Sequence, residues 1–437
     1  MDAINVRIRK QLCPKLQLAC LLLVILLMLP HLLFSQEKKK TVPDGTEGEV
    51  LELIDTSSAK KIKKSWNIFD LGFTTLRIGG GFLVDYAGYS QNEEGKNQMD
   101  SAKVELKAGF KVRDSRLALS GKFNTKRTIT WKAGFMYDGL QDAWFVRETG
   151  IMVAVPELWG HFFIGRTKEG VSLSKVMNGY SGEMMERHMA IDAIPILADG
   201  VKWLGFLPKQ RIFWNLGVFT DWVSEGQSFS TYSSQFAARV GFLPVHFAKT
   251  NLHIAVNYRV GRPTNDSIRI RSKPEASDAP FFVDAGKFAS DQGTYIGGEI
   301  YYSSGPWMVG SEYYWQHFRS SSKSNPVFNG GELVASYIFT GESRPYNTVS
   351  SIYGFVPVNR SVFKGGLGAW EAVLRYSTLD LDDGPILGGK FWRITPQVNW
   401  YLSENIRLEL AYGYGILDRF NMKGTTQFFQ SRIQLSL

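Results

Sequence analysis

The sequence predicts an all-β fold, a transmembrane antiparallel β-barrel of sixteen strands. Three observations lead to this prediction. The chain begins with a basic segment and a long apolar run, which is typical of exported proteins. Further along, many segments of about ten residues alternate apolar and polar side chains, and full charges stand on the polar side. Aromatic residues such as Trp370 and Trp400 lie near the ends of these segments, where membrane barrels carry aromatic girdles.

Residues 1–35 are expected to be a signal peptide that is cleaved near Ser35. Basic residues precede the apolar run "LQLACLLLVILLMLPHLLF", and the small Ser35 follows it. An uncleaved membrane anchor is the alternative. Both cysteines of the chain, Cys13 and Cys20, lie in this segment, so the exported protein would contain neither a disulfide nor a reactive thiol. Because Cys20 precedes the apolar core, the segment does not match a lipoprotein signal.

Residues 36–70 are expected to form a periplasmic N-terminal segment ahead of the barrel, which would span residues 71–437. The segment is polar and its charges come in blocks, a composition typical of a tether. The net charge of the whole chain is +9, and this modest basic excess is not clustered on one segment. We therefore expect no nucleic-acid partner.

The alternating segments are clearest near the C-terminus. In "AWEAVLRYS" and "IRLELAYGYG", apolar or small residues stand at every second position, and Glu and Arg lie between them. No stretch after residue 35 approaches the roughly 20 apolar residues of a membrane helix. A secreted β-sandwich is the alternative, since it also has one wet face. Repeated charges and amides on the polar face favour a barrel with a wet lumen.

Counting the segments gives sixteen strands, an even number as in bacterial barrels. The predicted strands cover residues 73–89, 101–123, 126–138, 141–153, 159–168, 199–206, 211–222, 233–245, 249–261, 293–303, 306–318, 330–340, 368–381, 390–402, 405–416 and 426–437.

The connections between the strands predict the orientation. "LSEN" (402–405) and "LPKQ" (207–210) are tight turns, and periplasmic turns are short. The polar loop at residues 90–100 would therefore face the outside. Long connections are usually functional when they lack secondary structure of their own. Three connections are long, at about 166–198, 262–292 and 341–367, and the third falls on the periplasmic side.

Specific motifs stand near the C-terminus: "FTGESRPY", "GAWEAVLRYSTLDLDDG" and "TPQVNWYLSENIRLEL". Weaker ones precede them: "KVRDSRLALSGKF", "GRTKEGVSL", "MMERHM" and "FFVDAG". Together they resemble the phosphate-selective porin O and P family of outer-membrane channels, over roughly residues 71–437. Two departures concern phosphate selectivity more than the barrel. Asp114 and Ser115 separate arginines that are commonly adjacent in the family, and "KEGVS" replaces a segment that there contains an aromatic residue.

The resemblance implies that the third extracellular loop folds into the barrel and narrows the pore, joined by the fifth loop and a long periplasmic connection. These would be the three long connections. It also implies a homotrimer in the outer membrane of a Gram-negative-type bacterium, within a lipid bilayer that contains lipopolysaccharide. Small anions such as phosphate would be the solutes. The terminal strand resembles the signal that the outer-membrane assembly machinery reads.

Arg166 and Lys168 are the first candidates for anion contacts at the constriction. They are two apart on one predicted strand and so would point to one face, while Phe163 and Gly165 would point to the other. Arginine suits phosphate because its guanidinium binds two oxygens at once.

Two further motifs contain basic residues. Arg187 in "MMERHM" is expected to pair with Glu186 or another carboxylate and to hold the loop inside the barrel. Arg113 and Arg116 are three apart, which puts them on opposite faces of a strand, so only one of them would line the lumen.

Other basic candidates stand in the long periplasmic connection and on the last strands. The connection contributes Arg344, Arg360 and Lys364. A ladder in the lumen would comprise Arg375, Arg393, Arg407 and Arg432, diluted by Glu371 and Glu409.

We expect no catalytic residues, no cofactor and no metal site. The six histidines are scattered, and "EMMERH" does not place two of them on one helix face. An outer-membrane hydrolase is a minor alternative. The predicted function is passive diffusion of small solutes with a preference for anions, because Arg and Lys lower the entry cost of an anion. The alternatives are a general or other-solute channel of the same fold, and a surface or secreted β-protein that is no channel.

The last segment, "QFFQSRIQLSL", is expected to close the barrel by pairing with the first strand, which leaves no free edge. The residues expected to face lipid are Phe429, Ile433, Leu435 and Leu437. Those expected to face the lumen are Gln430, Arg432 and Gln434.

Overall fold

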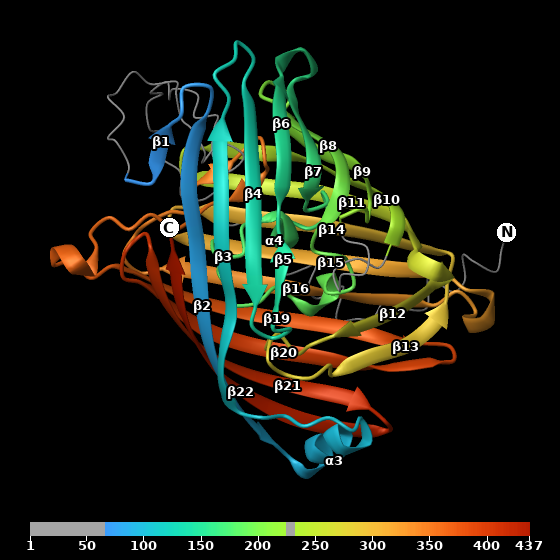
Figure 1. Cartoon of the computed structure of the whole chain (residues 1–437). Coiled ribbons are helices and arrows are strands. Elements are labelled where there is room, and N and C mark those ends of the chain that lie inside the picture. Colours follow the sequence, from blue (N-terminus) through green and yellow to red (C-terminus); the bar gives the residue numbers. More distant parts are fainter. Residues whose placement is uncertain (1–65, 224–231) are drawn as a thin grey trace. The chain divides into compact units, whose positions relative to one another are not determined.

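The computed structural model describes residues 66–223 and 232–437, which form a closed antiparallel β-barrel (Figure 1). The predicted wall of sixteen strands is confirmed. The predicted signal peptide and residues 36–65 lie outside the described residues. No helix in the described part of the chain is long and apolar enough to span a membrane.

The wall strands, in chain order, are β2 (Thr75–Gln91), β3 (Gly109–Lys122), β4 (Ile129–Asp138), β5 (Ala143–Val146), β6 (Thr149–Val155), β7 (Gly160–Thr167), β8 (Ala198–Leu207), β9 (Ile212–Thr220), β10 (Tyr232–Phe247), β11 (Thr250–Pro263), β14 (Gln292–Ser304), β15 (Trp307–Arg319), β16 (Val327–Ile338), β19 (Ala369–Asp383), β20 (Ile386–Tyr401), β21 (Ile406–Arg419) and β22 (Met422–Ser436). Both β5 and β6 pair with β4, so these two short strands make up a single wall strand. A short β1 (Ile68–Asp70) pairs with the start of β2.

The barrel closes where β2 pairs with β22. Gly81 lies opposite Ser436, and Gln91 lies opposite Thr426. The expectation that the last strand pairs with the first is therefore confirmed. In Figure 1 the two strands lie side by side at the seam between the blue and the red ends of the described chain.

One predicted strand begins too early. Residues 101–108 are not part of β3, because the helix α3 (Glu93–Ser101) and an irregular segment precede it. The side chain of Asn92 caps this helix by accepting a hydrogen bond from the Gly95 N–H at 2.9 Å. Glu93 and Glu94 in its first turn complement the helix dipole.

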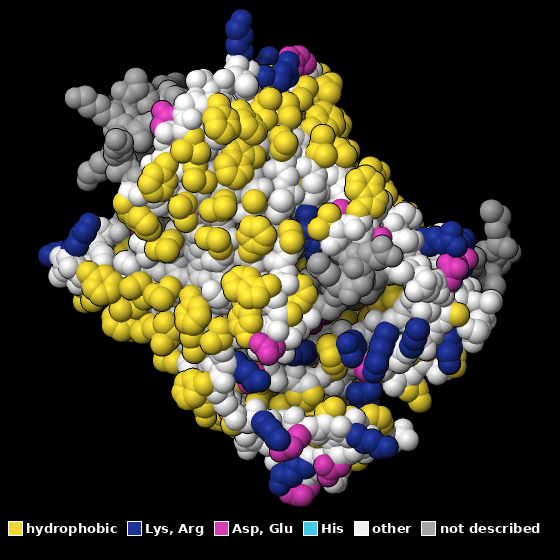
Figure 2. All heavy atoms as spheres, in the orientation of Figure 1, with side chains coloured by type: hydrophobic (Ala, Val, Ile, Leu, Met, Phe, Trp, Pro, Cys, Tyr) yellow, Lys and Arg dark blue, Asp and Glu magenta, His cyan; other side chains and the backbone are white. Residues whose placement is uncertain are grey.

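Side chains alternate between the two faces of the wall, as the pattern predicts. On the last two strands Leu410 and Ile433 are exposed on the outside, whereas Glu409 and Arg432 between them are buried inside. Phe429, Leu435 and Leu437 are also exposed. Figure 2 shows hydrophobic side chains gathered over the wall, with most charged side chains nearer its two ends. This apolar outer surface suits contact with lipid.

Three long connections fold into the barrel. We call residues 168–197 loop 3, residues 264–291 loop 5 and residues 339–368 the long turn. Loop 5 contains the hairpin β12 (Ser267–Ser272) and β13 (Val283–Ala289), and the long turn contains β17 (Tyr346–Asn347) and β18 (Ile352–Tyr353). The long turn leaves the same end of the barrel as residues 402–405, which we call the turn end; loops 3 and 5 leave the opposite, loop end.

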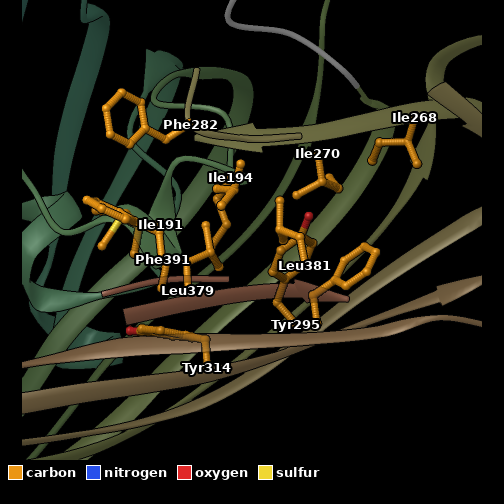
Figure 3. Close-up of a cluster of buried hydrophobic side chains, with 14 of the residues drawn as sticks. Ile191, Ile194, Ile268, Ile270, Phe282, Tyr295, Tyr314, Leu379, Leu381 and Phe391 are labelled. Carbon is orange, nitrogen blue, oxygen red and sulfur yellow. The ribbon is translucent and has the colours of Figure 1, made fainter. Parts of the chain in front are cut away.

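A hydrophobic cluster packs loops 3 and 5 against the inside of the wall (Figure 3). Loop 3 contributes Ile191 and Ile194, and loop 5 contributes Ile268, Ile270 and Phe282. The wall contributes Tyr295, Tyr314, Leu379, Leu381 and Phe391. These inward apolar residues belong to β14, β15, β19 and β20, so the loops are fixed to one side of the lumen.

Candidate functional site

A cavity of about 600 Å³ lies inside the barrel at its turn end. It is bounded by the inner face of β2, β3, β4 and β6 to β9, by loop 3 and by the long turn. Among the residues described, six cationic and two acidic side chains line it. These are Arg77, Arg116, Lys132, Arg147, Lys168, Lys202, Glu148 and Glu404.

A second cavity of about 50 Å³ continues the first toward the loop end. Arg116, Asn178 and Gly179 line both cavities, so the space narrows where loop 3 crosses the lumen. The smaller cavity is also lined by Arg113 and by residues 182–187.

Loop 3 is held at this narrowing by Tyr180 and Glu186. The Tyr180 hydroxyl donates to Asp114 Oδ1 on β3 at 2.6 Å, and its ring lies 4.4 Å from the Arg116 guanidinium. The ring fits because Gly81 on β2 has no side chain: a Cβ there would lie 2.2 Å from Tyr180 Cε2.

Glu186 is an acidic anchor of loop 3. Its Oε1 accepts from Arg432 Nη2 at 2.6 Å and from Arg113 Nε at 3.2 Å. Burial raises the pKa of a carboxyl group, but the positive charges of Arg113 and Arg432 outweigh burial and hold the pKa of Glu186 at about 2. The carboxylate is therefore ionised at neutral pH.

Arg113 and Arg116 both face the interior, so the prediction that only one could do so is wrong. A β-bulge causes this: Leu83 pairs with Asp114 but Val84 pairs with Val112, which leaves Arg113 as the extra residue. The bulge turns Arg113 toward Glu186.

Arg187 holds loop 3 together, although not through Glu186 as expected. Its guanidinium donates to the carbonyl oxygens of Ser174 and Met177 at 2.8 and 3.1 Å. Lys175, near the same turn, is buried, and its ammonium has no hydrogen-bond partner among the described residues. Burial lowers the pKa of Lys175 to about 7.

The structure separates Arg166 from Lys168. Arg166 is buried against Asp199 on β8, with 3.1 Å between Nη1 and Oδ1, and it does not line the large cavity. Lys168 follows the end of β7; it lines the cavity and donates to the Met177 carbonyl. Phe163 also lines the cavity, so the expectation that it faces away from Lys168 is wrong. Residue 168 lies beyond the strand, where the two-residue period no longer applies.

The predicted ladder arginines point inward, but loops cover them. Arg375 Nη2 donates to Glu275 of loop 5 at 2.5 Å, and Arg393 Nη1 donates to the Pro274 carbonyl at 2.6 Å. Arg432, described above, binds Glu186. Arg407 likewise donates to the Gly182 carbonyl at 2.7 Å. These side chains therefore fix loops 3 and 5 to the wall.

The long turn is fixed in the same way. Arg344 donates to Glu371 Oε2 at 2.8 Å and to the Ser181 carbonyl at 2.7 Å, which joins the long turn to β19 and loop 3. Lys364 instead lies exposed at the turn end, and Arg360 Nε donates to its carbonyl oxygen at 3.3 Å. Neither Lys364 nor Arg360 lines either of the two cavities described above.

Sequence comparison identifies the family of this barrel. A family model described as phosphate-selective porin O and P matches residues 76–435. The chain belongs to this porin family. Porin O of Pseudomonas aeruginosa is 23% identical over 209 residues, which cover 41% of this chain and 47% of that protein. An uncharacterized protein of Caulobacter vibrioides is 27% identical over 170 residues, which cover 38% and 34%. The chain thus spans less than half the length of the curated relatives it matches.

Several solved porin-like barrels have the same fold as this porin. An anion-selective porin from Comamonas acidovorans superposes with a TM-score of 0.53 at 13% identity, covering 83% of this chain and all of that one (100%). OmpT, an outer membrane protein of Vibrio cholerae in its trimer form, gives 0.52 at 12% identity, with coverage of 83% and 99%. Identities this low show the fold alone. The comparisons thus show the porin family of the chain and its barrel fold.

Sequence reasoning missed four cavity-lining cations of this porin, Arg77, Lys132, Arg147 and Lys202. Three of them carried a usable signal. Arg77 stands between Leu76 and Ile78. Lys132 stands between Trp131 and Ala133, and Lys202 stands between Val201 and Trp203, which is the alternation of an inward-facing position. Arg147 lies in the interruption between β5 and β6, where alternation gives no guidance.

Proposed function

We propose that this porin is a passive diffusion channel of the outer membrane that prefers small anions, phosphate or related oxyanions among them. The observation that carries the proposal is the large cavity, in which six cationic side chains face two acidic ones within the described residues. Fixed positive charge in a narrow, weakly screened space raises the local anion concentration and repels cations.

The narrowing at loop 3 supports selection at one place. A solute leaving the large cavity toward the loop end meets Arg116, Asn178 and Gly179 and then the smaller cavity. The guanidinium groups of Arg113 and Arg187 border that smaller cavity. Guanidinium and ammonium groups donate several hydrogen bonds to phosphate oxygens. Most of the basic side chains at the narrowing are held in place by contacts with loop 3.

The proposed setting is a homotrimer in a lipid bilayer that contains lipopolysaccharide. The apolar outer face of the wall supports a membrane setting (Figure 2). The trimer is supported by the description of one structural neighbour, OmpT of Vibrio cholerae, in a trimer form. Native mass spectrometry of the detergent-solubilised protein would test it, and a monomer would contradict it.

The channel is tested by reconstitution into a planar bilayer. We expect discrete conductance steps and, in a potassium chloride gradient, a reversal potential that favours chloride over potassium. Absence of conductance steps would contradict the channel function and favour the alternative of a scaffold protein. A cation-selective or unselective current would contradict anion preference and leave a general channel of the same fold.

The Lys132→Gln/Lys202→Gln double variant then tests the cavity. We expect the chloride-over-potassium permeability ratio to fall several-fold, because both side chains line the cavity. The matched control is Lys107→Gln, whose side chain is 73% exposed and pairs with Glu105 outside the cavity. Phosphate should reduce the chloride current, and Lys168→Ala should weaken this block. An unchanged chloride-over-potassium permeability ratio in the double variant would show that the cavity is not the selective element.

A further inference from the structure

Three side chains that could bind a metal ion meet where loop 3 contacts the wall. They are His188 of loop 3, Glu312 on β15 and Glu332 on β16. One potential ligand atom from each lies within 4.8 Å of the others. The three side chains are 0%, 0% and 1% exposed, so the cluster is shielded from the lumen.

His188 points into this cluster without a hydrogen bond. Neither ring nitrogen has a hydrogen-bond partner among the described residues, and the ring lies nearly parallel to that of Tyr314. The nearest carboxylate contact is from Nε2 to Glu312 Oε2 at 3.5 Å. A buried polar group without a hydrogen-bond partner destabilises the fold, so the position of this ring indicates a site for a ligand.

The two carboxylates bring more negative charge than their surroundings offset. Glu312 accepts hydrogen bonds from the Ser174 N–H at 2.8 Å and from the Tyr314 hydroxyl at 2.9 Å, which are neutral donors. The Tyr301 hydroxyl lies 3.0 Å from Glu312 Oε1 and 3.2 Å from Glu332 Oε1, so its one proton serves one of the two carboxylates at a time. The cationic neighbour of Glu332, Arg375, lies 3.6 Å away and also pairs with Glu275.

We propose that His188, Glu312 and Glu332 bind a divalent transition-metal ion of the zinc class. An imidazole nitrogen and carboxylate oxygens suit such an ion. The 3.5 Å between His188 Nε2 and Glu312 Oε2 is close to the spacing of two ligands held about 2.0–2.1 Å from a tetrahedral centre. The ion would fasten loop 3 to two wall strands, which goes beyond passage of anions and does not depend on it.

The ligands come from three elements that only the folded barrel brings together. This is why "EMMERH", with its one histidine, gave no metal spacing in the sequence. Because the site is buried, we expect the ion to enter while loop 3 docks into the barrel.

The test uses the full-length barrel in detergent, stripped with a chelator and refolded with Zn²⁺ or Co²⁺. We expect one ion per chain by elemental analysis, a Co²⁺ absorption spectrum of low coordination number, and a higher unfolding temperature with Zn²⁺. His188→Gln and Glu332→Gln should each weaken binding at least tenfold. The matched control is His317→Ala, which removes an exposed histidine from β15 and should leave binding unchanged.

Two results would overturn the site. The first is a refolded wild-type barrel that binds less than one ion per chain at micromolar Zn²⁺. The second is stoichiometric binding that persists in His188→Gln, which would assign the ion to other groups. His188→Gln keeps the size and a polar end at this position, and circular dichroism together with heat-modifiable gel mobility confirms that the variant is folded.

Discussion

Arg432 on β22 and Glu186 of loop 3 form an ion pair with 2.6 Å between Nη2 and Oε1. The same guanidinium donates to both oxygens of Asp85 on β2, at 2.7 and 2.6 Å. One side chain therefore joins the last strand, the first strand and the loop that narrows the lumen. Removing Arg432 should therefore loosen the loop and the seam together, whereas removing Glu186 should loosen the loop and leave the Arg432–Asp85 contact at the seam.

Glu186→Gln should lower the free energy of unfolding by about 3 kcal/mol, because the charges of Arg432 and Arg113 lose a buried partner. Urea titration followed by tryptophan fluorescence measures the change. Single-channel recordings should show a noisier current as loop 3 loses its anchor. Glu105→Gln is the control: its ion pair with Lys107 is exposed, and a change of at most about 1 kcal/mol is expected.

The same carboxylate makes loop anchoring sensitive to acid. The pKa of Glu186 in the folded barrel, about 2, lies below its ordinary value, so its contribution to stability is complete above that ordinary value and is lost as pH falls toward 2. We expect the wild type to lose more stability than Glu186→Gln between pH 5 and pH 3. Equal losses in the two proteins would contradict the assignment.

Lys175 should make the stability of the barrel depend on pH near neutrality. Its side chain is buried and lines neither cavity, and burial lowers its pKa to about 7, so the folded barrel loses this positive charge as pH rises through 7. Over the same range the unfolded chain binds more protons, so the free energy of unfolding should rise between pH 6 and pH 8, and the rise should be smaller in Lys175→Met. Urea titration at the two pH values measures the change, and an equal rise in the two proteins would contradict the assignment.

Substitution of Arg166 should lower the stability of the barrel, whereas substitution of Lys168 should weaken the block by phosphate. Arg166→Ala removes the positive charge that pairs with the buried Asp199 carboxylate and should cost about 3 kcal/mol, while Arg166→Ala/Asp199→Ala should cost less. Urea titration of both variants measures this coupling. Phosphate block should weaken in Lys168→Ala and stay unchanged in the Arg166 variants that fold. Weakened block in Arg166→Ala/Asp199→Ala would place Arg166 in the anion path.

Gly81→Ala should displace Tyr180 from the wall, because the new Cβ would lie 2.2 Å from Tyr180 Cε2. The hydrogen bond from Tyr180 to Asp114 would then be strained or lost, at a cost of about 1–3 kcal/mol. The lumen at loop 3 should change, and single-channel conductance reports it. Gly109→Ala is the control, since a Cβ there meets no atom within 4 Å. Equal effects of the two variants would show that Tyr180 is not positioned by Gly81.

The wall could be predicted from the sequence because every strand has the same two environments. Alternation of Leu410 with Glu409, or of Ile433 with Arg432, follows from lipid on one side and the interior on the other. Length alone identified the three connections that fold inward. The start of β3 was misplaced because the helix signal of Asn92, Glu93 and Glu94 was taken for a polar loop.

The fate of the interior charges could not be predicted in this way. Arg375 forms an ion pair with Glu275 of loop 5, and Arg432 forms one with Glu186 of loop 3. In both cases the partner is distant in sequence. The bulge at Arg113 has no local signal in "KVRDSR", since it depends on how β2 and β3 pair. A basic residue on an inward position can therefore line the path or hold a loop, and only the fold of the loops decides which.

The pairing of β2 with β22 also sets an order for folding. These strands lie at opposite ends of the described chain, so they meet only after every hairpin between them is available. Until they meet, Arg432 has no Asp85 beside it, and the interior into which loop 3 folds is not enclosed. Docking of loop 3 is then a late event, and an assembly intermediate would be an open sheet whose inner arginines are still hydrated. Such an intermediate should be held together by the hydrogen bonds between neighbouring strands before its interior has formed.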